Sequence, residues 1–307
     1  MTLPPPSPLE RLHHSAAFTA GVELYVKRDD LYTLAPGTAL QGNKVRKLAP
    51  ILQAALAAPE PPVLVSYGGA YSNHVSALAT AGDLCQLRTH LIIRGQEVDN
   101  TLLRAAESVG ATVDKISRSA YRLKNTPTYA AEIRFRLAED YRCPESSIWI
   151  IPEGGTTAEG VISAGTVYQE IEEQLPSPPD VICVSFGTGG TAAGIIQKAA
   201  PEVSVEVYPA LKGDWMSTEI ERWLPEGKPY NYECITDYHF GGYGKFPAAC
   251  IVPSPGLAKR ADLGEPGLPP LEPIYTAKLF YGVLDRVRKG TYPKGTRIVI
   301  IHTGGIY

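Results

Sequence analysis

The chain has 307 residues, of which 44% are hydrophobic and 20% are charged, and its formal net charge is -3. This balance is typical of a folded globular protein with room for one large domain or two ordinary ones, and it excludes a disordered chain. The small negative charge gives no general attraction to polyanions, so nucleic acid and anionic membranes are poor candidate partners.

The predicted elements alternate between strands and helices along most of the chain. Short apolar runs predict strands at Val22–Val26, Val63–Tyr67, His90–Ile93, Thr112–Ile116, Ser147–Ile151, Val181–Phe186, Val203–Tyr208 and Arg297–Ile301. Apolar residues at helical spacing predict helices at Leu48–Ala57, Val75–Ala81, Asn100–Val109, Pro127–Tyr141, Gly160–Leu175, Ala192–Ala199 and Ile274–Lys289. This alternation indicates βαβ units, so we expect an α/β fold with parallel sheets covered by helices on both faces. The segment Pro209–Pro273 is less regular and predicts long loops.

Targeting and cysteine patterns favour a reduced compartment. The start of the chain, Thr2–Pro8, is rich in proline and lacks the basic start and apolar core of a signal peptide. No apolar run approaches the roughly 20 residues that cross a bilayer. The five cysteines are far apart with no Cys-x-x-Cys pair, and the six histidines lack the spacing of zinc ligands. We therefore expect a cytoplasmic protein with free thiols and no metal site.

The stretch Gln41–Leu48 places three cations within four residues, after a Gly-Asn turn and before an apolar run. If it opens a helix, Lys44 and Lys47 share one face of the first turn, so one amine could do chemistry while the other holds an anion. A basic cluster on a solvated helix is the alternative. A phosphate-binding P-loop does not fit, because Asn43 separates the glycine from Lys44 and Val45 replaces the Ser or Thr that binds magnesium.

A second motif consists of Gly187, Thr188, Gly189, Gly190 and Thr191, between a buried strand and a helix. Glycines allow the backbone to approach a ligand, and free amides at a helix start attract an anion such as phosphate. The dinucleotide-binding pattern is not met in spacing, and no acidic residue follows at the expected distance. The motif predicts a monophosphate cup, with a plain tight turn as the alternative.

The loop Gly68–His74 also lies between a strand and a helix, and it offers a hydroxyl, an amide and an imidazole. A serine hydrolase lacks support because the Gly-x-Ser-x-Gly elbow is absent. The loop could instead bind a substrate carboxylate and a ring hydroxyl, or Ser72 could serve only as a helix cap. Glu153–Thr157 is a third, weaker loop of this kind. Tyr243 and Tyr275 follow suggestive glycine and proline patterns, although either alone would not indicate function.

Together these stretches resemble the pyridoxal-phosphate enzymes of the D-cysteine desulfhydrase and 1-aminocyclopropane-1-carboxylate deaminase family, in the tryptophan-synthase-β-like group of folds (fold type II). The resemblance covers nearly the whole chain. Seven motifs occur in the family's order, namely Val26–Leu31, Gly42–Leu48, Ser72–His74, Ile151–Thr156, Gly187–Thr191, Glu272–Tyr275 and His302–Gly305.

The resemblance implies a role for each matching residue around pyridoxal 5'-phosphate. Lys44 is placed like the Schiff-base lysine and Lys47 like a phosphate partner beside the 187–191 cup. Asn73 is similar to the residue that bonds the ring hydroxyl, and Ser72 to the one near the substrate carboxylate. The catalytic set would also include two tyrosines, Tyr243 and Tyr275. Thr303 matches the group near the pyridine nitrogen.

The resemblance also implies a reaction and a domain plan. A domain of residues 49–160 would be inserted into a cofactor-binding domain made of 1–48 and 161–307. The substrate would be a small D- or achiral amino acid, and the protein would form a homodimer. Cyclopropane deaminases are expected to carry Glu directly after the second tyrosine, where this chain has Thr276. That departure favours β-elimination from D-cysteine, with 1-aminocyclopropane-1-carboxylate deamination as one alternative.

Another alternative is a non-catalytic protein of this fold that binds the cofactor or an amino acid. The chain ends at Tyr307, just past a Thr-Gly-Gly turn where relatives generally continue. We expect a more open cofactor pocket at this end.

Overall fold

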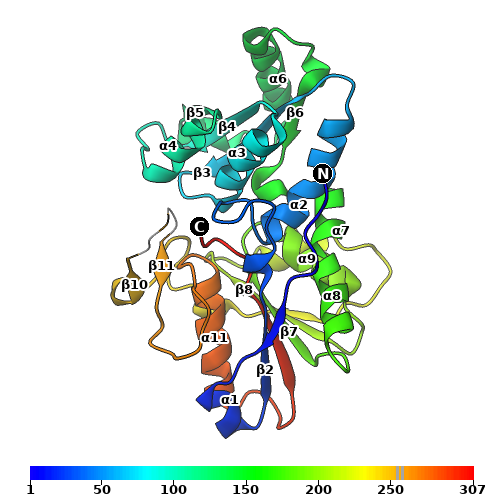
Figure 1. The fold of residues 1–307 in the computed structure, drawn as a ribbon, viewed down its shortest axis with the longest axis vertical. Helices are drawn as coiled ribbons and strands as arrows, with labels where there is room; N and C mark the ends of the chain where they lie inside the picture. The colour runs from blue at the N-terminus through cyan, green and yellow to red at the C-terminus, as the bar shows by residue number, and fades with distance from the viewer. Residues whose placement is uncertain (254–255, 257–258) are drawn as a thin grey trace. The chain divides into compact units, whose positions relative to one another are not determined.

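The computed structural model describes residues 1–253, 256 and 259–307, and contacts divide the chain into two compact units (Figure 1). Unit 1 comprises Ala35–Leu40 and Lys44–Gly160 with Met1, and unit 2 comprises Thr2–Leu34, Gln41–Asn43 and Val161–Tyr307. The chain thus passes between the units after Met1, Leu34, Leu40, Asn43 and Gly160. The predicted domains, 1–48 with 161–307 and 49–160, stay a prediction as functional parts. Four residues of the irregular segment Pro209–Pro273 lie outside the described residues.

Unit 1 is built on a parallel sheet of four strands in the order β5-β4-β3-β6. The strands are β3 (Val63–Gly69), β4 (Thr89–Arg94), β5 (Thr112–Ile116) and β6 (Ile148–Ile151). All residues of β3 up to Gly68 are buried. A central parallel strand is covered on both faces, which explains why its sequence is apolar apart from Ser66.

Five helices belong to this sheet: α2 (Asn43–Ala57), α3 (Asn73–Cys85), α4 (Thr101–Ser108), α5 (Arg118–Arg122) and α6 (Pro127–Tyr141). One apolar cluster joins α5 and α6 to β3, β4 and β6, while α3 packs against β3, β4 and α4. Four of these helices begin at a polar cap whose side chain accepts a hydrogen bond from the amide three residues later. The caps are Ser72, Asn100, Ser117 and Thr126.

Unit 2 contains a sheet of six strands in the order β1-β2-β12-β7-β8-β9. They are β1 (Leu9–Arg11), β2 (Glu23–Lys27), β7 (Val181–Phe186), β8 (Ser204–Pro209), β9 (Tyr232–Cys234) and β12 (Arg297–Ile301). Only β1 among them is antiparallel to its neighbour. A separate antiparallel pair is formed by β10 (Ile251–Val252) and β11 (Arg260–Ala261).

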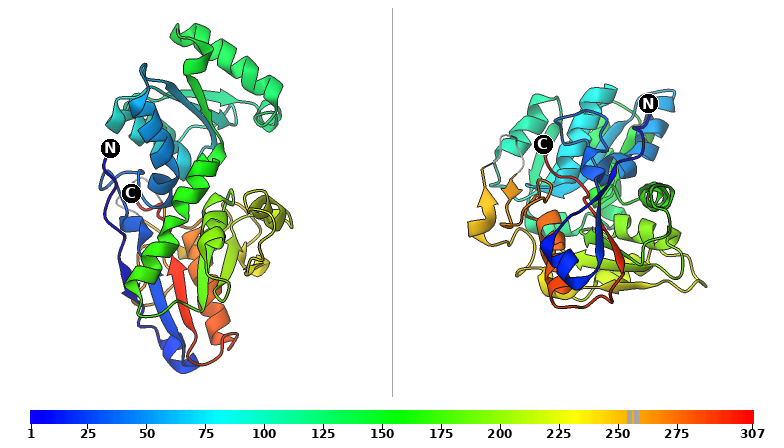
Figure 2. Two further views of the ribbon diagram at one scale, coloured as in Figure 1. Left: turned by 90° about the vertical axis from the view of Figure 1, so that its right-hand side faces the viewer. Right: turned by 60° about the horizontal axis from the view of Figure 1, so that its bottom comes forward.

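Helices cover both faces of the six-stranded sheet, which confirms the predicted α/β fold. On one face, α1 (Ser15–Ala20) and α11 (Thr276–Arg288) pack side by side (Figure 2). On the other face lie α8 (Thr166–Gln174), α9 (Gly190–Lys198) and the short α10 (Met216–Glu221). Strand β7 serves both, because Cys183 faces α11 while Ile182 and Val184 face α9.

Two helix predictions are corrected by the structure. The predicted single helix Gly160–Leu175 is wrong, because α7 (Ala158–Ala164) ends before Gly165 and α8 starts after it. At this break the backbone touches α9: a Cβ on Gly165 would lie 2.3 Å from the carbonyl oxygen of Gly194. Helix α2 begins at Asn43, five residues before the predicted start. The cationic stretch is therefore helical.

Short elements complete the chain. Single 3-10 turns occur at Asp29–Leu31, Glu145–Ser147, Glu153–Gly155, Thr236–Tyr238 and Ala248–Cys250. Strand β9 and helix α10 fall within the segment that was predicted to be irregular. Across the described ranges, the helices are all too short or too polar to traverse a bilayer.

Candidate active site

The glycine loop, residues 187–191, joins the end of β7 to the start of α9. All six residues of β7 are buried, and α9 begins inside the loop at Gly190. Gly189 has a φ of 80°, in the left-handed region that a side chain would disfavour. The loop therefore brings the first amides of α9 to the carboxyl end of a buried strand, where the partial positive charge of a helix start favours an anion.

The segment Gln41–Asn43 lies against this loop and against the end of β12. The side-chain amide of Asn43 donates a hydrogen bond to Thr191 Oγ1 over 3.0 Å, and its backbone amide donates to the carbonyl of Thr303 over 3.2 Å. At Gly42, a Cβ would lie only 2.2 Å from that same carbonyl oxygen, so only glycine fits. Because Asn43 is fixed beside the loop, the backbone of the next residue, Lys44, starts one peptide unit away.

The two predicted tyrosines form a pair, of which Tyr275 contacts the glycine loop. A Cβ on Gly187 would lie 2.9 Å from Cε1 of Tyr275, so the tyrosine ring packs directly on the loop backbone. The ring of Tyr243 meets that of Tyr275 edge to face, with centroids 6.2 Å apart and planes at 68°. Thr303 is buried on the neighbouring strand end, its hydroxyl 3.4 Å from that of Ser185. Unit 2 thus assembles four separate stretches of sequence into one place.

The start of α11, which carries Tyr275, is capped by a buried carboxylate that the sequence did not reveal. Glu272 accepts hydrogen bonds from the amides of Ile274, Tyr275 and Thr276 over 2.6–2.8 Å. Burial raises the pKa of Glu272, while these three amides act in the opposite direction. The hydroxyl of Thr276 closes the cap by accepting from the amide of Glu272 and donating to its carbonyl. A Glu before a Pro at the start of a predicted helix was the available signal.

In unit 1, Lys44 and Lys47 lie on the first turns of α2. Lys47 is buried, and its ammonium donates to Thr156 Oγ1 over 2.7 Å. Burial, and then the charge of Lys44, hold the pKa of Lys47 well below its usual range. Thr156 belongs to the weaker of the predicted loops, Glu153–Thr157. The structure therefore gives that loop a definite contact with the cationic helix.

His74 is the second buried base of unit 1. The hydroxyl of Ser66 donates to the carbonyl of Ile151 over 2.9 Å, so it accepts from His74 Nε2, which lies 2.7 Å away. Burial, and then the charges of Lys44 and Lys47, hold the pKa of His74 well below its usual range, so the ring is neutral. Its Nδ1 is then a buried acceptor that has no hydrogen-bond partner among the described residues.

The loop that precedes α3 holds the other predicted residues. Ser72 is the N-cap of α3, with its hydroxyl 3.4 Å from the amide of Val75, and Asn73 is the first helical residue. The cap alternative for Ser72 is therefore realised. A contact of Ser72 with a substrate carboxylate, and of Asn73 with a ring hydroxyl, stays a prediction.

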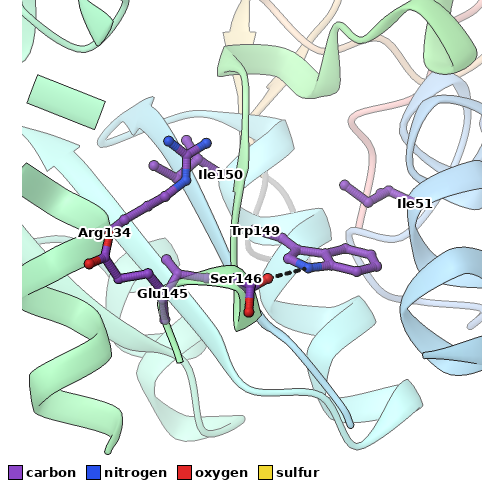
Figure 3. Close-up of a pocket in the computed structure, with 7 residues that line it drawn as sticks. Ile51, Arg134, Glu145, Ser146, Trp149 and Ile150 are labelled. Atoms are coloured by element: carbon purple, nitrogen blue, oxygen red, sulfur yellow. Dashed lines mark hydrogen bonds between the residues drawn. The ribbon is translucent and has the colours of Figure 1, made fainter. Parts of the chain in front are cut away.

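A pocket of about 450 Å³ in unit 1 shares no residue with the predicted site. It is lined by Ile51, Arg134, Glu145, Ser146, Ile148, Trp149 and Ile150, mostly from the edge strand β6 and the 3-10 turn before it (Figure 3). The indole of Trp149 donates to the carbonyl of Ser146 over 3.1 Å, as Figure 3 shows. Its lining offers no cluster of bases comparable to that around Lys44.

Comparison with known proteins identifies the family. Residues 2–210 match the model described as pyridoxal-phosphate dependent enzyme. The chain belongs to this family. A protein of Pyrococcus horikoshii, named putative 1-aminocyclopropane-1-carboxylate deaminase, is 31% identical over 93% of this chain and 85% of its own. A mitochondrial protein of Arabidopsis thaliana, named bifunctional D-cysteine desulfhydrase/1-aminocyclopropane-1-carboxylate deaminase, is 30% identical over 98% of this chain and 76% of its own.

A solved structure supports the same grouping. The crystal structure of an ACC deaminase homologue has a TM-score of 0.78 and 27% identity, and covers 100% of this chain and 91% of that one. The predicted family, fold type, enzyme class and pyridoxal phosphate cofactor are confirmed. The alternative of a non-catalytic binding protein therefore gives way to a pyridoxal-phosphate enzyme.

The residues of unit 2 fit such a cofactor on their own chemistry. A phosphate requires donors and closely approaching backbone, and the glycine loop supplies amides at the start of α9 with the hydroxyls of Thr188 and Thr191. The backbone at Gly42 and Gly187 leaves no room for a Cβ, so both positions are kept small beside the loop. The hydroxyl of Thr303 adds a neutral polar group nearby. The fit supports these residues as the cofactor-holding set.

Proposed function

We propose that the protein is a pyridoxal-phosphate lyase or deaminase of a small D- or achiral amino acid, and that it converts D-cysteine to pyruvate, ammonia and sulfide. The observation that carries this proposal is the convergence in unit 2 of the glycine loop, Asn43, Tyr275 and Thr303. Lys44 follows Asn43 directly in the chain, so its backbone starts next to a residue that is bonded to the loop.

Each part of this site has a proposed role in holding the cofactor. The amides and threonine hydroxyls of the glycine loop bind its phosphate, with Lys47 as a further partner. Thr303 would meet the pyridine nitrogen and Asn73 the ring hydroxyl. Lys44 would form the covalent link. Support comes from the position of each residue at a strand end or helix start, where backbone donors are available.

The reaction requires a base for the Cα proton, a group that binds the substrate carboxylate, and loss of the sulfur as a leaving group. When bound, the cofactor takes up the electron pair that remains at Cα after a proton leaves. The amine of Lys44 removes that proton, and Ser72 holds the substrate carboxylate. Tyr243 and Tyr275 orient the side of the substrate that reacts, because their rings already form one packed pair. Burial, and then the charges of neighbouring lysines, lower the pKa values of His74 and Lys47.

The overall reaction balances without an oxidant or reductant. The C–S bond of D-cysteine breaks, and the sulfur leaves as hydrosulfide with a proton. The remaining three-carbon amine takes up water and releases ammonia, which leaves pyruvate. The net change is D-cysteine plus water to pyruvate, ammonia and hydrogen sulfide.

Deamination of 1-aminocyclopropane-1-carboxylate is the second candidate, favoured by the names of the relatives. Residue 276 argues for the first. Thr276 is fully buried, and its hydroxyl is engaged with the backbone of Glu272 in the cap of α11. A carboxylate at this position, expected in cyclopropane deaminases, is absent, so ring opening lacks that acid or base.

One assay tests the proposal and separates the candidates. The purified enzyme, loaded with pyridoxal phosphate, is given D-cysteine, L-cysteine or 1-aminocyclopropane-1-carboxylate, and sulfide, pyruvate and 2-oxobutyrate are each measured. The proposal predicts sulfide and pyruvate in equal amounts from D-cysteine, with less from L-cysteine. Turnover of 1-aminocyclopropane-1-carboxylate with a higher kcat/KM than D-cysteine would establish the second candidate, and no turnover of any of the three would refute both.

The proposal includes a homodimer in the cytoplasm. Support for the compartment is the five free cysteines, and support for the dimer is the family resemblance. Light scattering coupled to size-exclusion chromatography measures the mass directly. A mass of one 33.1 kDa chain would contradict the dimer.

A further inference from the structure

We infer that Lys278 is a positioning residue for Tyr243. Its ammonium binds backbone carbonyls of the turn 239–242, which precedes Tyr243, and thereby holds the Tyr243 ring against that of Tyr275. The inference rests on the proposed function for its catalytic consequence. The structural claim, that one buried ammonium orders this turn, stands on the contacts in unit 2 alone.

The ammonium of Lys278 is saturated by carbonyl oxygens from two separate segments. Its side chain is 1% exposed. It donates to Ala210 at the end of β8 over 2.9 Å, and to His239 and Gly242 over 2.9 and 2.8 Å. An ammonium has three N–H donors, so all of them are used. Two of the three bonds end on the turn directly before Tyr243.

This turn has an unfavourable backbone that needs an external hold. Phe240, Gly241 and Gly242 have φ values of 53°, 91° and 118°, three consecutive residues in the left-handed half of the map. Glycine adopts such φ values freely, so the cost falls on Phe240, whose left-handed backbone persists only where the surroundings fix it. Within the turn, the amide of Gly241 donates to Nδ1 of His239, the amide of Gly242 to the carbonyl of His239, and the amide of Lys245 to the carbonyl of Gly242. Charge-assisted bonds from Lys278 are stronger than these neutral ones.

Lys278 also belongs to the turn of helix that presents Tyr275. The two residues are three positions apart at the start of α11, and Tyr275 is its N-cap residue. Glu272 fixes that start through the amides of Tyr275 and Thr276. The helix start is therefore a rigid base that carries one tyrosine directly and grips the turn of the other through Lys278. This connects the two rings, whose centroids are 6.2 Å apart.

A comparison with Lys27 shows why Lys278 is more than a generic buried cation. Lys27 is also buried, but its ammonium pairs with the carboxylate of Glu170 at 2.7 Å. The direct acceptors of Lys278 are neutral carbonyls, and burial lowers its pKa to about 8 although the charge of Glu272 raises it. The charged form of Lys278 is thus maintained against a desolvation penalty, and its ammonium binds the turn 239–242.

The test compares Lys278→Met, which removes the donors at similar size, with Lys278→Arg, which keeps the charge. Lys289→Met, at an exposed position at the end of the same helix, is the matched control. Hydrogen exchange of residues 239–245 is followed in the enzyme before and after loading with pyridoxal phosphate. Cofactor absorbance, kcat and KM for D-cysteine are measured on the same preparations.

The inference predicts that Lys278→Met increases exchange in residues 239–245 at least tenfold and lowers kcat at least tenfold, with a smaller change in KM and normal cofactor absorbance. Lys278→Arg should restore part of the exchange protection and part of kcat. If kcat of the parent enzyme falls as pH rises through about 8, kcat of Lys278→Arg should not fall, because arginine stays charged. Lys289→Met should match the parent in all readouts. Unchanged exchange and unchanged kcat in Lys278→Met would overturn the inference.

A second variant covers the case in which Lys278→Met does not fold. Gly242→Ala keeps the lysine but strains the turn. The added Cβ has room, because its nearest neighbour, Lys212, would lie 3.7 Å away, but alanine disfavours the φ of 118° at this position. It should also raise exchange in residues 239–245 and lower kcat, and a parent-like result would overturn the inference. Should the parent enzyme turn over none of the substrates, the proposed function fails, while the exchange data still decide whether Lys278 orders the turn.

Discussion

Each unit buries a lysine close to residues of the candidate site, and the two are held in different ways. Lys47 in unit 1 donates to the hydroxyl of Thr156 and lies in the field of Lys44. Lys278 in unit 2 spends all three donors on backbone carbonyls. We propose that Lys47 meets the cofactor phosphate, whereas the three carbonyl contacts of Lys278 fix a turn. Burial alone does not separate these roles, but the atoms that each ammonium contacts do.

The largest effect is expected at Lys44, which belongs to the same cationic turn as Lys47. Lys44→Ala removes the proposed base and should lower kcat by about 10²- to 10⁴-fold or more. Steady-state release of pyruvate from D-cysteine measures it, with Lys228→Ala at an exposed position as the control. A Lys44→Ala enzyme that keeps more than a tenth of parental kcat would contradict the role of Lys44 as the base.

The two lysines can next be separated by the pH dependence of stability in the cofactor-free protein. Both have a folded pKa below the unfolded value of 10.5. Between the two values the unfolded chain binds more protons, so the free energy of unfolding rises with pH, by at most about 1.4 kcal/mol per pH unit for each group. For Lys278 this window runs from about 8 to 10.5, and for Lys47 it starts well below 10.5.

Lys47→Met should therefore remove one contribution to this slope and leave that of Lys278, as measured by urea unfolding from pH 7 to 9.5. Cofactor affinity should fall in Lys47→Met and stay near the parental value in Lys278→Met, since only Lys47 is proposed to meet the phosphate. Equal losses of affinity in the two variants would erase the distinction drawn between them.

A smaller effect is expected for the cap of α11. Thr276→Val keeps the shape but leaves the amide of Glu272 without its acceptor, which should cost about 1–3 kcal/mol in the free energy of unfolding. Thr276→Ser retains the hydroxyl and should lose less. The ratio of kcat/KM between D-cysteine and 1-aminocyclopropane-1-carboxylate should stay within twofold in Thr276→Ser. A large change in that ratio would show that residue 276 takes part in choosing the substrate.

The smallest effect is expected at the pocket on β6. Trp149→Phe loses the bond from the indole to the carbonyl of Ser146, worth about 0.5–1.5 kcal/mol in thermal or urea unfolding. Its kcat and KM should stay within twofold of the parent because the pocket shares no residue with the candidate site. A tenfold loss of kcat would mean that unit 1 has a second region coupled to turnover.

The sequence predicted the parts of the molecule that local pattern decides. Strands β7 and β12 and helix α6 have the predicted bounds, since a buried parallel strand reads as a short apolar run and a proline marks a helix start. Strand β5 also has the predicted bounds, although it is partly exposed at the edge of its sheet. The glycine loop and Lys44 were found for the same reason. Each is defined by residues that are consecutive in the chain.

The features that escaped prediction depend on partners distant in sequence. The break between α7 and α8 lies where Gly165 touches Gly194, and hydrophobic spacing carries no trace of that contact. The three acceptors of Lys278 lie 36 to 68 residues away, so the sequence showed only a lysine in an amphipathic helix. Likewise, the pairing of Lys47 with Thr156 spans 109 residues.

The most direct test of the account is to find which lysine carries the cofactor. The purified enzyme, loaded with pyridoxal phosphate, is reduced with borohydride, digested and mapped by mass spectrometry. The account predicts one phosphopyridoxyl group on the peptide that contains Lys44, and its absence from that peptide when D-cysteine is added before reduction. A label on Lys47 or Lys278, or a Lys44 peptide that stays unmodified in an active enzyme, would contradict it.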